Sequence, residues 1–307
     1  MQTFDLVTRY VRETPWAIMP EMLAVICDVI AFRAAGGRLS ADEIAGRIGA
    51  ESFAARPPRA VVKGAVAVLG LRGVIAHRVE ALNDVSAPAG TSTQLFTRRF
   101  REALADDAIG KILIDVDSPG GSVDGVPELA DEILRSRGRK PVTAIVNTLG
   151  ASAAYWIASA ADEIVITPSG QVGSIGVWSA HEDLSVFYEN KGIKTTLISA
   201  GEHKVEGNPF EPLGDDARAH LQSRVDAFFE MFVDAVANGR GVKAADVRGG
   251  FGRGRMVGAA EAKAAGMVDR IATFDEVLAG LLEGAPARPT RASARHRHSF
   301  TFGSETR

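Results

Sequence analysis

The chain has 307 residues, 46% hydrophobic and 24% charged, and its 35 basic and 38 acidic side chains give a net charge of −3. This composition fills a core, which excludes collagen-like and wholly disordered chains, and the small net charge provides no field to attract nucleic acid or an anionic membrane. The single cysteine, Cys27, excludes an internal disulfide and fits a reducing compartment. No Cys/His cluster has zinc spacing, so we expect neither a metal nor a cofactor.

Residues 1–57 are predicted to form a small helical N-terminal segment. Its most apolar stretch, Met22–Phe32, spans 11 residues and contains an aspartate, whereas a membrane-spanning helix needs about 20 apolar residues. We therefore interpret it as an amphipathic or buried helix rather than a membrane anchor, and expect a cytoplasmic protein without a membrane span. Ser40 and Glu43 form a capping-box pattern, and the prolines of residues 56–59 indicate a linker.

Residues 58–283 alternate between strand and helix patterns, which predicts an α/β domain with a mainly parallel sheet. The predicted strands lie within 61–75 and at 112–117, 142–146, 163–166, after 173, and at 195–199. The predicted helices cover 93–105, 126–134, 152–161, 182–190 and 215–238.

Residues 284–307 contain five arginines, two histidines and one glutamate among small residues. Such a segment buries too little apolar surface to order itself, so we predict a disordered basic tail. It is either a plain solvated end or an interaction tail.

Two glycine- and serine-rich turns follow predicted strands. In the first, Gly120 and Gly121 would let backbone N–H groups face a cleft, as an oxyanion site requires, although a tight structural turn explains them equally well. In the second, Ser152 begins a predicted helix, where the helix dipole favours developing negative charge. Ser152 is therefore either a helix N-cap or a nucleophile.

A nucleophilic serine needs a base, and two candidates follow Ser152 in the chain. His181 is one, and Lys204 is the other; a lysine acts as a base only when uncharged, which requires burial or a nearby cation. Ser174, in a third glycine-rich turn, could hold the lysine amine in position, or serve only as a turn residue.

Together these segments resemble the signal peptide peptidase A family of serine peptidases, which has the Clp-protease/crotonase-like fold, a spiral of β-β-α units. The matching motifs are Asp117–Gly121, Gly150–Tyr155, Val172–Val177 and Gly201–Lys204, and their order and spacing match the family over about residues 60–275. Any one motif alone would be weak.

The resemblance implies a Ser–Lys dyad, with Ser152 as nucleophile, Lys204 as general base and Ser174 hydrogen-bonded to the lysine. It also implies an oxyanion hole formed by the N–H groups of Gly121 and Ala153, with Gly120 shaping the turn. The Clp proteases carry a histidine about 25 residues after the serine, where this chain has a valine, so the dyad is preferred over a Ser–His–Asp triad.

The chain most resembles the phage and prophage branch, the capsid assembly (minor capsid protein C) proteases. That implies a serine endopeptidase that processes head or scaffold proteins, works as a homo-oligomeric ring, and lies in the cytoplasm or a phage prohead. In this family active sites can be built from neighbouring subunits. The alternatives are a signal-peptide or membrane-fragment peptidase, an inactive structural head component, and a crotonase-like acyl-CoA enzyme.

Overall fold

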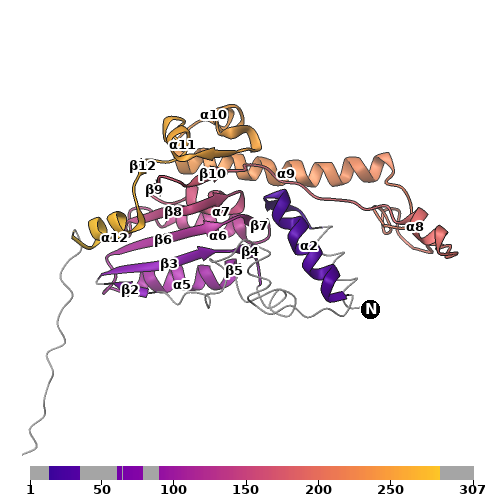
Figure 1. Ribbon diagram of the computed structural model, residues 1–307, viewed down its shortest axis with the longest axis horizontal. Helices are drawn as coiled ribbons and strands as arrows, with labels where there is room; N and C mark the ends of the chain where they lie inside the picture. Colours follow the sequence, from indigo (N-terminus) through magenta and orange to yellow (C-terminus); the bar gives the residue numbers. More distant parts are fainter. Residues whose placement is uncertain (1–13, 35–60, 64, 79–89, 284–307) are drawn as a thin grey trace, which may run out of the picture.

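The computed structural model describes residues 14–34, 61–63, 65–78 and 90–283 (Figure 1). The predicted Ser40–Glu43 cap, the linker at 56–59 and the tail at 284–307 lie outside these residues. No helix within the described ranges is both long enough and apolar enough to cross a bilayer.

An eight-stranded, mainly parallel sheet forms the centre of the molecule and confirms the predicted α/β class. Its main path runs β11-β10-β8-β6-β3-β2; off this path, β9 pairs with β8, and β12 pairs with β9. The strands are β2 (Val61–Lys63), β3 (Val66–Arg72), β6 (Lys111–Ser118), β8 (Val142–Ala151), β9 (Glu163–Ile166), β10 (Gln171–Gly173), β11 (Met256–Gly258) and β12 (Arg270–Ile271).

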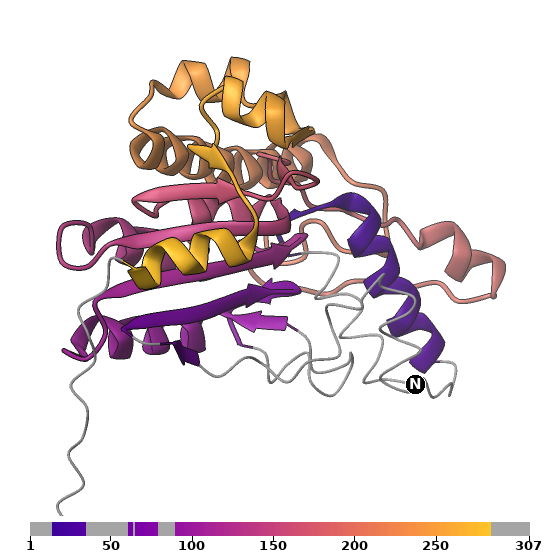
Figure 2. The same ribbon diagram turned by 60° about the vertical axis from the view of Figure 1, so that its left-hand side comes forward.

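Helices cover both faces of this sheet because its strands are apolar on both sides. On one face the main core packs beneath α5 (Thr93–Ala105), α6 (Val126–Arg135), α7 (Ala153–Ser159) and α9 (Asp215–Arg240). On the other face, α12 (Phe274–Glu283) places Val277 and Leu278 against the strands (Figure 2). The short α10 (Ala244–Gly250), η1 (Gly252–Gly254) and α11 (Ala259–Ala264) complete this part of the chain.

A second sheet of four short strands has the order β1-β7-β4-β5. It consists of β1 (Trp16–Ile18), β7 (Gly120–Ser122), β4 (Val74–Ala76) and β5 (Gly90–Ser92). After β1, the chain enters α2 (Pro20–Ala34), whose Leu23, Ile26 and Ile30 pack with Trp16 and Ile18. Trp16–Ile18 is thus extended, where the sequence predicted helix for the whole N-terminal segment.

The predicted strand at 195–199 is wrong. Residues 191–200 form no strand, and Ile198 is 95% exposed. A β pattern becomes a strand only where a neighbouring strand accepts its backbone hydrogen bonds, and none of the strands in the described ranges pairs with it. The helix predicted over 182–190 is shorter, α8 (Ser185–Asn190), while the helices at 93–105 and 215–238 are confirmed almost to the residue.

Candidate active site

Ser152 lies between the end of β8 and the start of α7, in a backbone conformation that few non-glycine residues adopt. Its φ is 55° and its ψ is −118°. The conformation is held from both sides, because Ser152 N donates to Gly173 O at 2.8 Å and Trp156 N donates to Ser152 O at 2.9 Å. Strain of this kind persists only where the surroundings enforce it, and a sharp strand-to-helix turn is typical of a nucleophilic serine.

The Ser152 hydroxyl does not cap the helix it precedes. No side-chain hydrogen bond caps α7, and Ser152 Oγ is buried without any hydrogen-bond partner. A capping serine would accept a bond from an N–H of the first turn. Of the two interpretations of Ser152, the N-cap is therefore excluded, and the hydroxyl remains available for another group.

Gly120 lies beside Ser152 and has no space for a side chain. Its φ is +98°, and a Cβ at this position would lie 3.0 Å from Ser152 Cβ and 3.1 Å from Ala151 O. Gly120 N donates to Ser118 Oγ at 3.2 Å, so this N–H is already used within the turn. The predicted role of Gly120 in shaping the turn stays a prediction.

The N–H groups of Gly121 and Ala153 were predicted to form the oxyanion hole. A Cβ on Gly121 would lie 1.8 Å from Ile75 O, so this residue must be glycine for β7 to approach β4. Ala153 is the first residue of α7, where N–H groups lack acceptors within the helix. Ala153 directly follows Ser152 and Gly121 directly follows Gly120, and the role of their N–H groups as donors remains a prediction.

Ser174 is brought next to Ser152 by the pairing of β8 and β10. In that parallel register Gly173 is opposite Ala151, so the residues that follow the two strands are neighbours. Ser174 has a φ of 52°, and its N–H donates to Arg255 O at 2.9 Å. The two predicted serines therefore lie at the same edge of the sheet.

The C-terminal end of α7 is held by one guanidinium group. Arg137 donates to the carbonyl oxygens of Ser159, Ala160 and Ala161, and to that of Gly239 in α9. A cation at two helix C-termini interacts favourably with both helix dipoles. Arg137 thus fixes the helix that directly follows Ser152.

Two aromatic side chains of α7 attach the helix to the rest of the domain. Trp156 stacks on Phe232 of α9, with ring centroids 4.5 Å apart. Tyr155 Oη donates to Met267 O at 2.9 Å. Burial raises the pKa of Tyr155, so the phenol stays protonated and does not supply a base.

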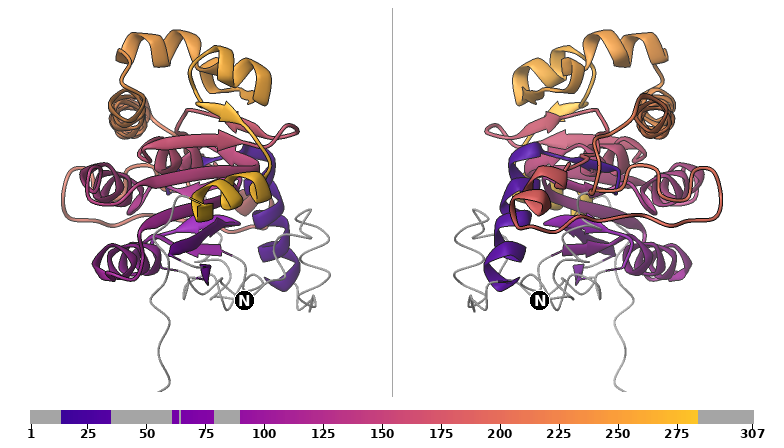
Figure 3. Two further views of the ribbon diagram at one scale, coloured as in Figure 1. Left: turned by 90° about the vertical axis from the view of Figure 1, so that its left-hand side faces the viewer. Right: turned by 90° about the vertical axis from the view of Figure 1, so that its right-hand side faces the viewer.

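Lys204 is not brought to Ser152 within one chain. It lies in a turn, where its N–H donates to Gly201 O at 3.2 Å, and its side chain is exposed. Residues 179–214, which we call the arm, include α8 and extend away from the sheet beyond the start of α9 (Figures 1 and 3). Since Ser152 Oγ has no hydrogen-bond partner, a single copy leaves the predicted dyad unassembled.

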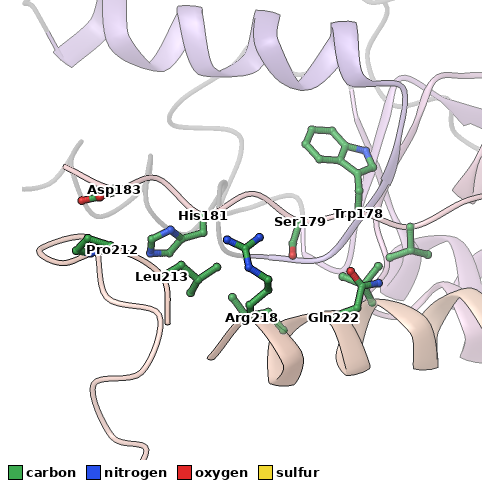
Figure 4. Close-up of a pocket in the computed structure, with 11 residues that line it drawn as sticks. Trp178, Ser179, His181, Asp183, Pro212, Leu213, Arg218 and Gln222 are labelled. Atoms are coloured by element: carbon green, nitrogen blue, oxygen red, sulfur yellow. The ribbon is translucent and has the colours of Figure 1, made fainter. Parts of the chain in front are cut away.

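His181, the other candidate base, also has a different partner. One of its ring nitrogens, Nε2, lies 3.0 Å from Asn208 O, within the arm. His181 lines a pocket of about 620 Å³ between Trp178 and the first turns of α9, together with Arg218 and Gln222 (Figure 4). The described residues include no cluster able to hold a metal ion.

The sequence analysis did not identify the strand beside the site. Trp16–Ile18 pairs with Gly120–Ser122, yet this stretch was assigned to a helical segment. A usable signal was present, because Pro15 and Pro20 bracket the run and a residue before proline favours extended backbone.

Comparison with known proteins identifies the class. Residues 135–287, just under half of the chain, match the model of peptidase family S49. It is 35% identical to the capsid assembly protease C of Escherichia phage lambda over 76% of this chain and 52% of the relative. It is 37% identical to the head-tail preconnector protein GP5 of Enterobacteria phage P21 over 63% of this chain and 38% of the relative.

A third relative is the putative signal peptide peptidase SppA of Enterococcus faecium, 26% identical over 69% of this chain and 61% of that protein. These matches confirm the resemblance to the signal peptide peptidase A family and to its phage branch. The chain spans about half the length of the lambda relative and less of the P21 relative.

Proposed function

We propose that the chain is a serine endopeptidase that works through an acyl-enzyme. The observation that carries the proposal is the Ser152 hydroxyl, buried, unbonded and held in a strained turn beside Gly120. A structural serine in such a place would satisfy its own hydrogen bonds. One whose bonds are left open is suited to receive a base and to attack a carbonyl.

In this mechanism uncharged Lys204 Nζ takes the Ser152 proton while Oγ attacks the carbonyl carbon of the scissile bond. The N–H groups of Gly121 and Ala153 stabilise the resulting oxyanion, an effect worth about 2.7–4 kcal/mol for each donor. The lysine then gives its proton to the leaving amine, and later activates the water that hydrolyses the ester. Ser174 holds the amine in position.

The lysine comes from a neighbouring copy in this proposal. Supporting it are the exposed position of Lys204 and the unpartnered Ser152 hydroxyl. The arm also displays apolar side chains that a monomer leaves in water: Val186, Phe187, Ile193 and Ile198, between 52% and 95% exposed. A patch of this kind marks a contact surface, and a homo-oligomer would both cover it and desolvate the lysine.

We further propose that the substrates are head or scaffold proteins of a phage, because two relatives carry capsid-assembly and head-tail names. Cleavage of a signal peptide or membrane-protein fragment is the second candidate, supported by the E. faecium relative. A location in the cytoplasm or a prohead belongs to the first candidate.

A serine-directed phosphonate reagent, with the labelled peptide mapped by mass spectrometry, tests the activity. We expect labelling at Ser152, loss of labelling in Ser152→Ala, and at least a 100-fold slower reaction in Lys204→Ala with an unchanged unfolding temperature. Full reactivity in Lys204→Ala would refute the dyad. Absence of labelling at Ser152 in an intact oligomer would favour the inactive head component, and binding of CoA the crotonase-like enzyme.

A further inference from the structure

Strand β1 pairs with β7, the strand that contains Gly120 and Gly121 of the site. In its antiparallel register, Ala17 is opposite Gly121 and Ile18 is opposite Gly120. The pairing continues at both ends, since Val123 N donates to Pro15 O at 3.3 Å and Met19 N donates to Pro119 O at 3.2 Å. The edge of β7 that faces Ser152 is therefore occupied.

The other side of β1 is held as well. Trp16 and Trp178 exchange backbone hydrogen bonds of 2.8 and 3.0 Å, and Trp178 Nε1 donates to Ile18 O at 3.1 Å. Trp16, Ala17 and Ile18 are each no more than 3% exposed. The three residues thus fill a narrow slot between β7 and the segment that follows Ser174.

The slot that β1 fills lies next to Ser152. A Cβ built on Gly120 would be 2.2 Å from Ala17 O and 3.0 Å from Ser152 Cβ. The carbonyl of Ala17 and the side chain of Ser152 therefore lie within a few ångströms of one another, on either side of one glycine. A peptide group of the chain itself is present where the site would receive a substrate carbonyl.

Extended peptides bind proteins by adding a strand to a free edge, with backbone hydrogen bonds giving affinity and side-chain pockets giving selectivity. A substrate that presents a carbonyl to Ser152 beside Gly121 must use this same edge. We infer that β1 occupies the substrate groove as an internal pseudosubstrate, which an incoming peptide displaces. The inference rests on the proposed peptidase function.

The side chains of β1 indicate which peptides the groove would bind. Trp16 and Ile18 pack with α2 on one side of the strand, whereas Ala17 faces the main core beside the site. The groove therefore takes an extended peptide with a small residue at the position nearest Ser152, flanked by larger apolar residues. Displacement leaves the rest of the sheet paired, because β1 is its edge strand and β7 also pairs with β4.

The alternative is that β1 is only structural, since Trp16 and Ile18 belong to the hydrophobic cluster under α2. Binding of a peptide in trans separates the two. The probe is a fluorescent peptide with the sequence of residues 14–19, and the protein is the full chain carrying Ser152→Ala, so that no turnover occurs. Its affinity is measured with and without Trp16→Ala, which weakens the internal strand.

We expect at least tenfold tighter binding to the Trp16→Ala form. A peptide methylated at the nitrogen equivalent to Trp16 N should bind at least tenfold more weakly, because it lacks the donor to Trp178 O. Ile30→Ala is the matched control: it weakens the same cluster from the side of α2 while leaving every side chain of β1 in place, and should not improve binding.

A second measurement keeps the test valid if Trp16→Ala fails to fold. In the chain carrying only Ser152→Ala, hydrogen exchange at Trp16 N–H should rise at least fivefold on adding millimolar peptide. Unchanged exchange, or equal binding in the Trp16→Ala and Ile30→Ala forms, would overturn the inference. Neither readout needs catalysis, so failure of Ser152 labelling would refute the peptidase proposal while leaving this result to stand or fall alone.

Discussion

The turn around Ser152 and the arm around Lys204 are opposites in almost every physical respect. Ser152 is 1% exposed, between two strand ends and a helix, and its backbone is held by hydrogen bonds on both sides. In the arm, Ile198 is 95% exposed and Lys204 lies in an isolated turn. One half of the proposed dyad is thus built by the fold of a single chain, and the other half is not.

This difference suggests that the Ser152 turn depends on packing within one chain, whereas the arm with Lys204 depends on association between copies. Packing of α7 against the core determines the geometry of Ser152, so that mutations there should act through the folded chain. Within the arm only Asn208 is buried, so that the contribution of the arm should depend on association. The following predictions separate these two dependences, beginning with the largest expected effect.

Gly121→Ala should abolish activity by disturbing the Ser152 side of the site, which the fold of one chain builds. The new Cβ would meet Ile75 O at 1.8 Å, and since a backbone atom cannot move aside, β7 must shift and carry the oxyanion donor with it. We expect at least a 100-fold loss in kcat/KM, in line with loss of one such donor. Gly176→Ala is the matched control, since a Cβ there meets nothing within 4 Å; equal kcat/KM in the two variants would contradict this role.

Ile198→Asp should affect the arm and its proposed contact with a second copy. A charge in the apolar patch of the arm would oppose burial between copies, so we expect at least a tenfold loss of activity at low protein concentration, with a smaller oligomer by light scattering. The unfolding temperature of the separated protomer should not change. Ile198→Leu keeps the apolar surface and should behave like the unaltered chain; an Ile198→Asp oligomer of unaltered size would argue against the patch as a contact.

Arg137→Gln should lower stability by about 2–3 kcal/mol, because it removes a charged donor from the carbonyls at the ends of α7 and α9. The free energy of unfolding from denaturant titration measures this loss. Arg139→Gln, an exposed neighbour, should change it by less than about 0.5 kcal/mol. Equal losses in the two variants would show that the hydrogen bonds from Arg137 to the end of α7 make no particular contribution to the free energy of unfolding.

Asp269→Asn should have the smallest effect, and one that depends on pH. Burial alone would raise the pKa of Asp269, but hydrogen bonds from Arg240 and from Ile164 N outweigh it and hold the pKa below its ordinary value. The stabilisation is therefore full at neutral pH and lost as the pH falls through the lowered pKa. Because the carboxylate is 40% exposed, we expect a loss of about 1 kcal/mol at pH 7.

Thermal unfolding of Asp269→Asn and the unaltered chain across the acid range tests this. The two curves should converge at low pH. A difference that stayed constant with pH would contradict the assigned role of the carboxylate.

The sequence was sufficient for those parts that depend on local pattern. Thr93–Ala105 has a clear amphipathic repeat and is a helix with those bounds, and the motif around Ser152 predicted a turn between strand and helix. The strand predicted at residues 195–199 was wrong because, among the residues that the structure describes, no strand pairs with this β-favouring segment. Trp16–Ile18 failed in the opposite way, since its extended form depends on pairing with Gly120–Ser122, more than 100 residues later in the chain.

The same division explains the site. Ser152 and Ser174 lie at the same edge of the sheet because β8 and β10 are neighbours, in a sheet that alternating strands and helices predict. Lys204 was predicted from a motif alone, and no pattern in the sequence shows which group its amine contacts. The spacing of motifs predicts which residues form a site. A contact between copies depends instead on surfaces that the sequence pattern of one chain does not reveal.

Mixing two inactive variants tests the account most directly. Ser152→Ala and Lys204→Ala are each purified as oligomers, dissociated, combined in equal amounts and reassembled, and cleavage of an unfolded polypeptide is followed. We predict recovery of about a quarter of the unaltered activity, because that fraction of sites pairs an intact serine with an intact lysine from the next copy. Activity no higher than that of either variant alone, in mixed oligomers verified by mass, would contradict a dyad shared between copies.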